Sequence, residues 1–127
     1  MLFESVKKRL GGFGVTIGDR DIWMINFCIE KTENHIKNTC NVLEIPFGLF
    51  NVACDMAVGE FLLIKMQTGQ LEVSDLDFSA AISQLREGEV SIEFSKGSSD
   101  QEKFDSLVNY LLTKGEGDLI SYRRIKW

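Results

Sequence analysis

One segment constrains the fold more than any other: the run from Pro46 to Gly69 is apolar on almost every face. Proline suits the first turn of a helix, and glycine is common just beyond a helix C-terminus. The sequence therefore predicts a helix that reaches about Gln67. A helix that is hydrophobic nearly all round must be covered nearly all round. Because a chain of 127 residues offers few other elements, we expect partner subunits to help cover it.

The sequence before this segment predicts two more helices. Residues 2–10 form a short one, and the glycine-rich stretch 11–18 that follows is a loop or a short strand. A longer helix begins at Asp19 or Asp21 and reaches about Cys40. Its apolar stripe, which we expect to face the core, consists of Ile22, Ile25, Ile29 and Ile36, with Trp23 and Phe27 beside it.

The sequence after the apolar segment predicts a short helix within 77–86, an extended stretch and a C-terminal helix. The extended stretch alternates apolar and polar residues with the period of a strand, its apolar members being Val90, Ile92 and Phe94. Its backbone groups need partners, either residues 13–17 of the same subunit or a neighbouring subunit. Ser99-x-x-Glu102 is a capping box that opens the C-terminal helix, and Gly115 ends that helix.

These elements predict one all-α domain over residues 1–127, with about five helices and one short extended segment or minor β-hairpin. No uninterrupted apolar run approaches the roughly 18 residues that a membrane span needs. The basic start of the chain leads into glycines and not into the apolar core of a signal peptide. We therefore expect a soluble intracellular protein without a membrane partner. An odd number of cysteines in such a chain favours buried free thiols.

Residues that could carry catalysis or hold a cofactor are sparse. The only histidine, His35, lies within the predicted second helix without the signature of a nucleophilic site. The three cysteines lack the spacing of a zinc site, and the acidic residues within 72–77 lack that of a calcium loop. The sequence thus predicts a protein that is not an enzyme and has no catalytic residue, metal or cofactor.

Charge is distributed unevenly along the chain. Residues 38–95 carry two basic and nine acidic side chains, a balance that repels nucleic-acid phosphates. Basic clusters remain at Lys7–Arg9 and at Arg123–Lys126, the second interleaved with aromatic residues. Arginine, tyrosine and tryptophan are enriched at interface hot spots, so we expect a partner to contact the terminal cluster. The alternative is a small DNA-binding regulatory module that uses both basic clusters.

Three segments resemble one family in the same order. Residues 40–49, Cys-Asn-Val-Leu-Glu-Ile-Pro-Phe-Gly-Leu, and the helix after them with Gly59-Glu60-Phe61 are similar to its central part. Residues 82–94 resemble its glycine turn and extended stretch, and residues 122–127, Tyr-Arg-Arg-Ile-Lys-Trp, resemble its aromatic and basic tail. The family is that of the head–tail connector proteins of tailed bacteriophages, also called head-completion or DNA-packaging proteins.

The resemblance implies a structural adaptor that forms a homo-oligomeric ring beneath the portal protein after DNA packaging. Such a subunit can be monomeric before assembly, in the host cytoplasm, and then sits at the head–tail interface of the virion. Genomic DNA passes through the ring without specific binding, and a tail-side connector or stopper protein docks next. By this match the partner contacts are Tyr122, Arg123, Arg124, Lys126 and Trp127. We expect the subunit contacts at Val90, Ile92 and Phe94.

Overall fold

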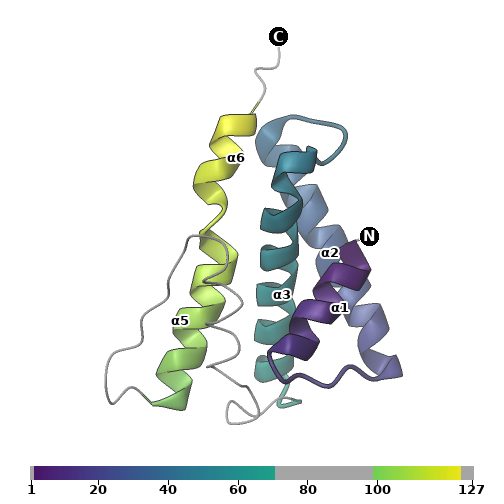
Figure 1. Ribbon diagram of the computed structural model, residues 1–127, viewed down its shortest axis with the longest axis vertical. Coiled ribbons are helices and arrows are strands. Elements are labelled where there is room, and N and C mark those ends of the chain that lie inside the picture. The colour runs from purple at the N-terminus through teal and green to yellow at the C-terminus, as the bar shows by residue number, and fades with distance from the viewer. Residues whose placement is uncertain (1, 71–98, 124–127) are drawn as a thin grey trace.

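The computed structural model describes residues 2–70 and 99–123, which are helical almost throughout (Figure 1). The elements are α1 (Leu2–Gly12), α2 (Asp19–Cys40), the 3-10 turn η1 (Phe47–Leu49), α3 (Phe50–Gln67), α5 (Asp100–Thr113) and α6 (Glu116–Tyr122). The all-α prediction is confirmed. Residues 13–17 form a turn and a loop, so the alternative of a short strand there is wrong. The predicted helix within 77–86 lies outside the described residues, as does the extended stretch with Val90, Ile92 and Phe94.

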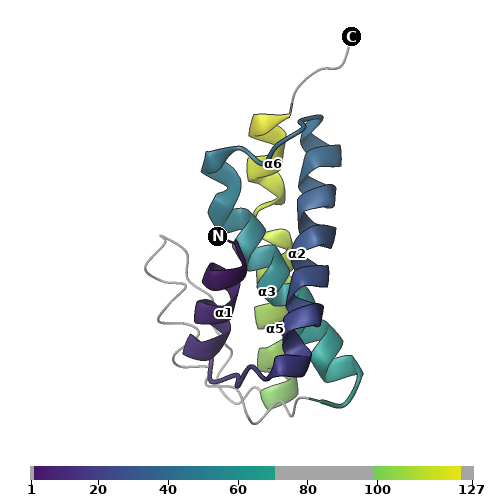
Figure 2. The same ribbon diagram turned by 90° about the vertical axis from the view of Figure 1, so that its right-hand side faces the viewer.

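Helix α3 is the centre of the fold, with α1, α2 and α5 packed around it (Figures 1 and 2). Eleven of its eighteen residues are buried. The segment Phe47–Gln67 is by itself long and apolar enough to cross a membrane, but most of it is buried inside the fold. Most of this cover therefore comes from the chain itself. Small residues contribute to it, because Gly59 lets α5 approach α3 closely.

The core consists of two clusters along α3. The larger one holds Phe13, Phe61 and Phe104, all fully buried. The smaller one, which lies between the ends of α2, α3 and α6, holds Leu49 and Leu119 among others. The glycine-rich stretch supports this arrangement, because α1 runs on through Gly12 before the chain turns, and Phe13 and Val15 then anchor the turn in the core.

Helix α2 has the predicted bounds, and most of its predicted apolar stripe faces the core. Ile25, Ile29 and Ile36 are buried as predicted. Ile22, the fourth member of the stripe, is 40% exposed, and the neighbouring Trp23 and Phe27 are exposed as well. A helix turns about 100° per residue, so the two aromatic residues, each two positions from Ile25, point almost directly away from it. The aromatic residues beside the predicted stripe therefore form a solvent-facing surface of α2.

Buried ion pairs tie α3 to its neighbours. The Lys65 ammonium lies 2.7 Å from the Asp21 carboxylate, and both side chains are about nine-tenths buried. Asp21 also accepts the backbone N–H of Gly18 at 3.0 Å, which caps the start of α2. Nearer the start of α3, Arg9 of α1 pairs with the buried Asp55. Each pair fixes one helix against the centre of the fold.

The Asp21 carboxylate makes stability depend on pH. Burial alone would raise its pKa, but hydrogen bonds from Lys65 and Gly18 and the Lys65 charge outweigh burial, so the pKa lies below 3.8. The contribution of this carboxylate is therefore complete above about pH 4 and lost as pH falls through the lowered pKa. We expect the free energy of unfolding, measured with urea from pH 2.5 to 6, to fall with acid less steeply in Asp21→Asn. Equal slopes for both proteins would contradict this assignment.

Candidate assembly surfaces

The last helix, α6, is held against the rest of the molecule by close backbone approach. Gly115 begins it, and a Cβ atom at that position would overlap the side chain of Val52 in α3. Leu119 is fully buried, and its carbonyl accepts a hydrogen bond from the Cys40 thiol at 3.4 Å. The C-terminal helix is therefore a fixed part of the fold, and it places residues 120–123 beside the end of α2.

Tyr122 lies directly over the backbone of η1. A Cβ atom at Gly48 would overlap the phenol of Tyr122, so only glycine leaves room for this ring. The fold thus brings together Gly48 and Tyr122, which are more than 70 residues apart in the sequence.

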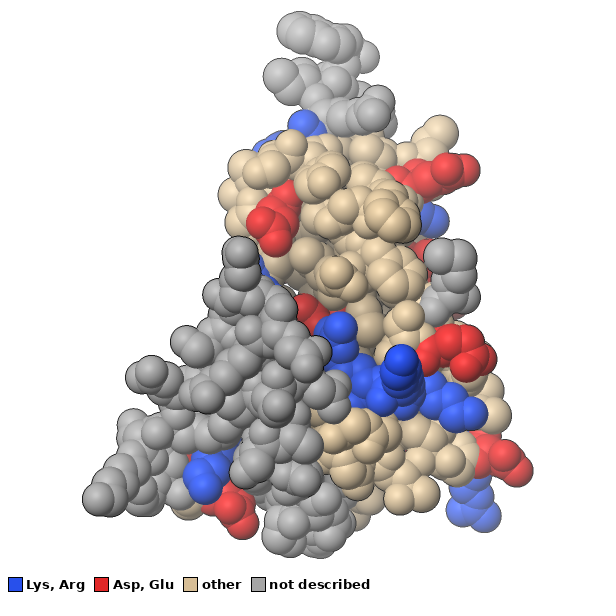
Figure 3. Space-filling view, viewed as in Figure 1, with Lys and Arg blue, Asp and Glu red and all other residues tan. Residues whose placement is uncertain are grey.

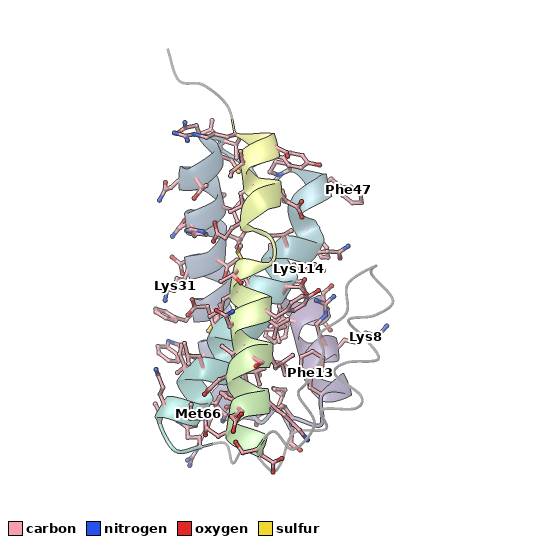
Figure 4. All side chains as sticks on the ribbon, turned by 90° about the vertical axis from the view of Figure 1, so that its left-hand side faces the viewer. Lys8, Phe13, Lys31, Phe47, Met66 and Lys114 are labelled. Atoms are coloured by element: carbon pink, nitrogen blue, oxygen red, sulfur yellow. The ribbon has the colours of Figure 1, made fainter. Side chains whose placement is uncertain are left out.

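Exposed apolar side chains lie at the same end of the molecule as this contact. Leu43 is 93% exposed, Phe47 89% and Ile120 72%, and Tyr122 is partly exposed. They come from the loop after α2, from η1 and from α6, which share the upper end of the ribbon in Figures 1 and 2. Figure 4 shows Phe47 projecting away from the fold. We call these four residues the apical surface, and a soluble monomer has little reason to expose so many large apolar groups together.

Of the five partner-contact residues predicted for the tail, Tyr122 and Arg123 are described. Arg123 follows α6 in an extended backbone conformation, at the same end of the molecule as the apical surface. Arg124, Lys126 and Trp127 lie outside the described residues. Reasoning from the sequence missed Leu43, Phe47 and Ile120. A signal was present for the first two, because the turn 42–47 between two helices is mostly apolar, and turns are usually polar.

A second exposed apolar feature lies on α2. The rings of Trp23 and Phe27 stack with their centroids 5.8 Å apart and an interplanar angle of 16°. Trp23 is 71% exposed and Phe27 48%. We call this pair the aromatic ridge. It lies nearer the start of α2, whereas the apical surface lies at the far end of that helix.

The polar cleft between α2, α3 and the α5–α6 junction has a volume of about 210 Å³. Two side-chain pairs line it: the ion pair of Lys31 with Glu60 and the hydrogen bond between His35 and Glu116, each at 3.1 Å. His35 is half-exposed on its helix, in agreement with the sequence. A histidine beside a carboxylate resembles part of a catalytic triad, but the residues that line this cleft include neither serine nor cysteine. These pairs connect helices.

The cysteines are free and buried, as predicted. Burial raises the pKa of Cys28 to about 11, and it also raises the pKa values of Cys40 and Cys54. All three are therefore neutral thiols at pH 7 and poor nucleophiles. Within residues 2–70 and 99–123, no group of three or more His, Cys, Asp or Glu side chains is placed to hold a metal ion.

The N-terminal basic cluster is divided between two roles. Arg9 is engaged with Asp55, whereas Lys7 and Lys8 are exposed on α1. Figure 3 shows basic groups over this helix with acidic groups beside them, and Figure 4 shows Lys8 directed outward. Two lysines on one helix offer few phosphate contacts, and affinity for DNA rises with the number of such contacts.

No family model, curated protein or solved structure matches this chain.

Gly48→Ala is expected to displace the Tyr122 ring, because the added methyl group occupies its place. The Arg123–Arg124 peptide bond comes directly after Tyr122 in the sequence. Loss of the Tyr122 contact should make this bond more accessible, so we expect trypsin to cleave it several times faster in the variant. Stability should change by only about 1 kcal/mol, since Tyr122 is at the surface. Gly117→Ala, where a Cβ atom meets nothing within 4 Å, is the matched control. Equal cleavage rates in the two variants would contradict the packing of Tyr122 on Gly48.

Proposed function

We propose that this chain is a structural adaptor subunit of a phage head–tail connector, which forms a ring beneath the portal after DNA packaging. In this proposal the apical surface and residues 122–127 dock on the portal protein. The opposite end of the subunit faces the next tail-side protein. The chain contributes binding surfaces and no chemistry.

One observation supports this function above others: the contact of Tyr122 with Gly48. Segments 40–49 and 122–127, which resemble connector proteins, meet at this contact and at no cost to the fold, because Gly48 leaves room for the ring. Arg123 follows Tyr122 in an extended backbone conformation, and Leu43 and Phe47 are exposed at the same end of the molecule. Exposed aromatic and aliphatic groups beside arginine have the composition of an interface hot spot.

The charge distribution agrees with a channel subunit. With a net charge of −5, the chain has no large positive field with which to hold DNA. A wall of this kind lets the genome slide through without binding it. The proposal predicts weak, non-specific binding of the free chain to duplex DNA. Tight binding that weakens steeply with salt would favour the DNA-binding module instead.

The proposal is tested by the substitution Leu43→Ser. This side chain is almost fully exposed, so folding should be unaffected. We expect binding to purified rings of the cognate portal protein, measured by co-sedimentation, to weaken about tenfold or more, as hot-spot substitutions do. Gln101→Ser, exposed at the start of α5 and far from the apical surface, is the control. Undiminished portal binding by Leu43→Ser would exclude the apical surface as the docking site.

A further inference from the structure

The aromatic ridge needs a cover that the described residues do not provide. Two stacked rings that are 71% and 48% exposed leave much apolar area in water. Burial of one large aromatic side chain removes roughly 150–250 Å² from solvent, so the ridge offers a substantial gain to whatever covers it.

A groove that suits such a ridge lies on another face of the same molecule. It has a volume of about 500 Å³ and is lined mostly by apolar side chains from α1, from the turn before η1 and from the start of α3, with one acidic residue of α2. Figure 2 shows this face, between α1 and α2 and below the turn. The lining residues used here are Leu2, Phe3, Ile45, Phe47, Phe50 and Glu33. Pockets of roughly 300–1,000 Å³ hold drug-sized ligands, so two stacked rings fit.

The ridge and the groove belong to different faces of α2. Asn26, Ile29 and Glu33 line the groove, whereas Trp23 and Phe27 point roughly 100° away from them around the helix axis. A copy therefore cannot place its own ridge in its own groove. Two different surfaces that complement each other are what a head-to-tail contact requires, and a head-to-tail contact closes into a ring when the rotation permits.

Charge favours the same pairing. Arg20 is exposed one turn before Trp23, and Glu33 lines the groove; neither forms an ion pair within the described parts of the chain. Thirteen residues of one helix separate them by about 20 Å, so they cannot meet in a single copy. Glu30 follows the ridge on its other side, and Lys7 lies one turn along α1 from Phe3. Arg20 at one end of the ridge can therefore face Glu33 of a second copy, and Glu30 at the other end can face its Lys7.

We propose that the aromatic ridge of one copy docks in the groove of the next copy, with Arg20 facing Glu33, and that this is the subunit contact of the ring. The proposal rests on the proposed function, whose ring it completes. Two rings in one groove bury less than the roughly 800 Å² per partner of a stable complex. A single contact is therefore weak, and repeated contacts on a portal template hold the ring together.

Disulfide trapping tests this contact on the full chain. Arg20→Cys and Glu33→Cys are prepared separately, mixed at high concentration and oxidised mildly; the three native thiols are buried. We expect covalent dimer from the mixture and none above background from either variant alone. A mixture of Arg20→Cys with Gln101→Cys is the control. Dimer from Arg20→Cys alone, or no excess over the control mixture, would overturn the proposal.

Trp23→Ser in the Arg20→Cys chain provides a second test. Trp23 is mostly exposed, so the substitution leaves folding intact. Trapping with Glu33→Cys should become roughly tenfold slower, the effect of losing an aromatic anchor. An unchanged rate would show that the ridge does not enter the groove.

These outcomes separate the two proposals. If the unmodified chain binds portal rings but the mixture gives no dimer, the subunit contact is wrong and the adaptor function stands. If the mixture gives dimer but the unmodified chain does not bind portal rings, the contact between ridge and groove stands and the adaptor function fails.

Discussion

Lys65→Met is expected to lower the free energy of unfolding by about 3–5 kcal/mol, because it leaves a buried carboxylate without its cation. The Lys65 ammonium lies 2.7 Å from Asp21 and also donates to the Gln70 side chain at 3.2 Å. Methionine fills a similar volume, so the loss reports on charge and not on packing. Urea unfolding at pH 7, followed by circular dichroism, measures the change.

Two further variants locate the cause. Lys31→Met removes the ion pair with Glu60. Because the Lys31 side chain is 57% exposed, the free energy of unfolding should fall by less than about 1 kcal/mol. Adding Asp21→Asn to Lys65→Met should recover part of the loss, because no charge is then buried and an acceptor for the Gly18 N–H remains. Equal costs for the two lysine substitutions, or no recovery, would mean that the buried pair does not hold α2 against α3.

Phe61→Ala should cost about 3–5 kcal/mol in dilute solution, the usual range for a fully buried phenylalanine. Phe61 lies in the larger core cluster, on the helix that α1, α2 and α5 surround. The loss should not vary with protein concentration, since the cover of α3 comes from its own chain. Thermal unfolding at several concentrations measures it.

Phe27→Ala is the matched control, because Phe27 is about half-exposed on the aromatic ridge. It should cost less than about 1.5 kcal/mol. A small effect of Phe61→Ala at low concentration, rising as the protein is concentrated, would mean that partner subunits cover α3 after all.

Local patterns were enough to predict most helix bounds. Pro46 and Gly69 delimit η1 and α3, and Gly69 has the positive φ of 72° expected just beyond a helix end. Ser99 accepts the N–H of Glu102 as the capping box predicted. These features depend on neighbours within a few residues, and local neighbours are what a single sequence displays.

Features that depend on distant residues were predicted less well. The apolar period of α2 could not show where the cover from α1 and α3 would end, so Ile22 was placed in the core stripe and the exposure of Trp23 and Phe27 was not predicted. The apolar composition of α3 indicated that the helix is buried, but it did not show which elements cover it. Gly48 carries no sign that Tyr122 lies over it, because the overlap exists only once η1 and α6 are side by side. The apical surface was missed for the same reason.

The central claim is that this chain docks on a portal ring through its apical surface. Electron cryomicroscopy of cognate portal rings incubated with the unmodified chain tests it most directly. The account predicts one additional closed ring of density, with Leu43 and Tyr122 of every subunit against the portal. Portal rings without added density at saturating chain, or a ring bound with its apical surfaces directed away from the portal, would contradict it.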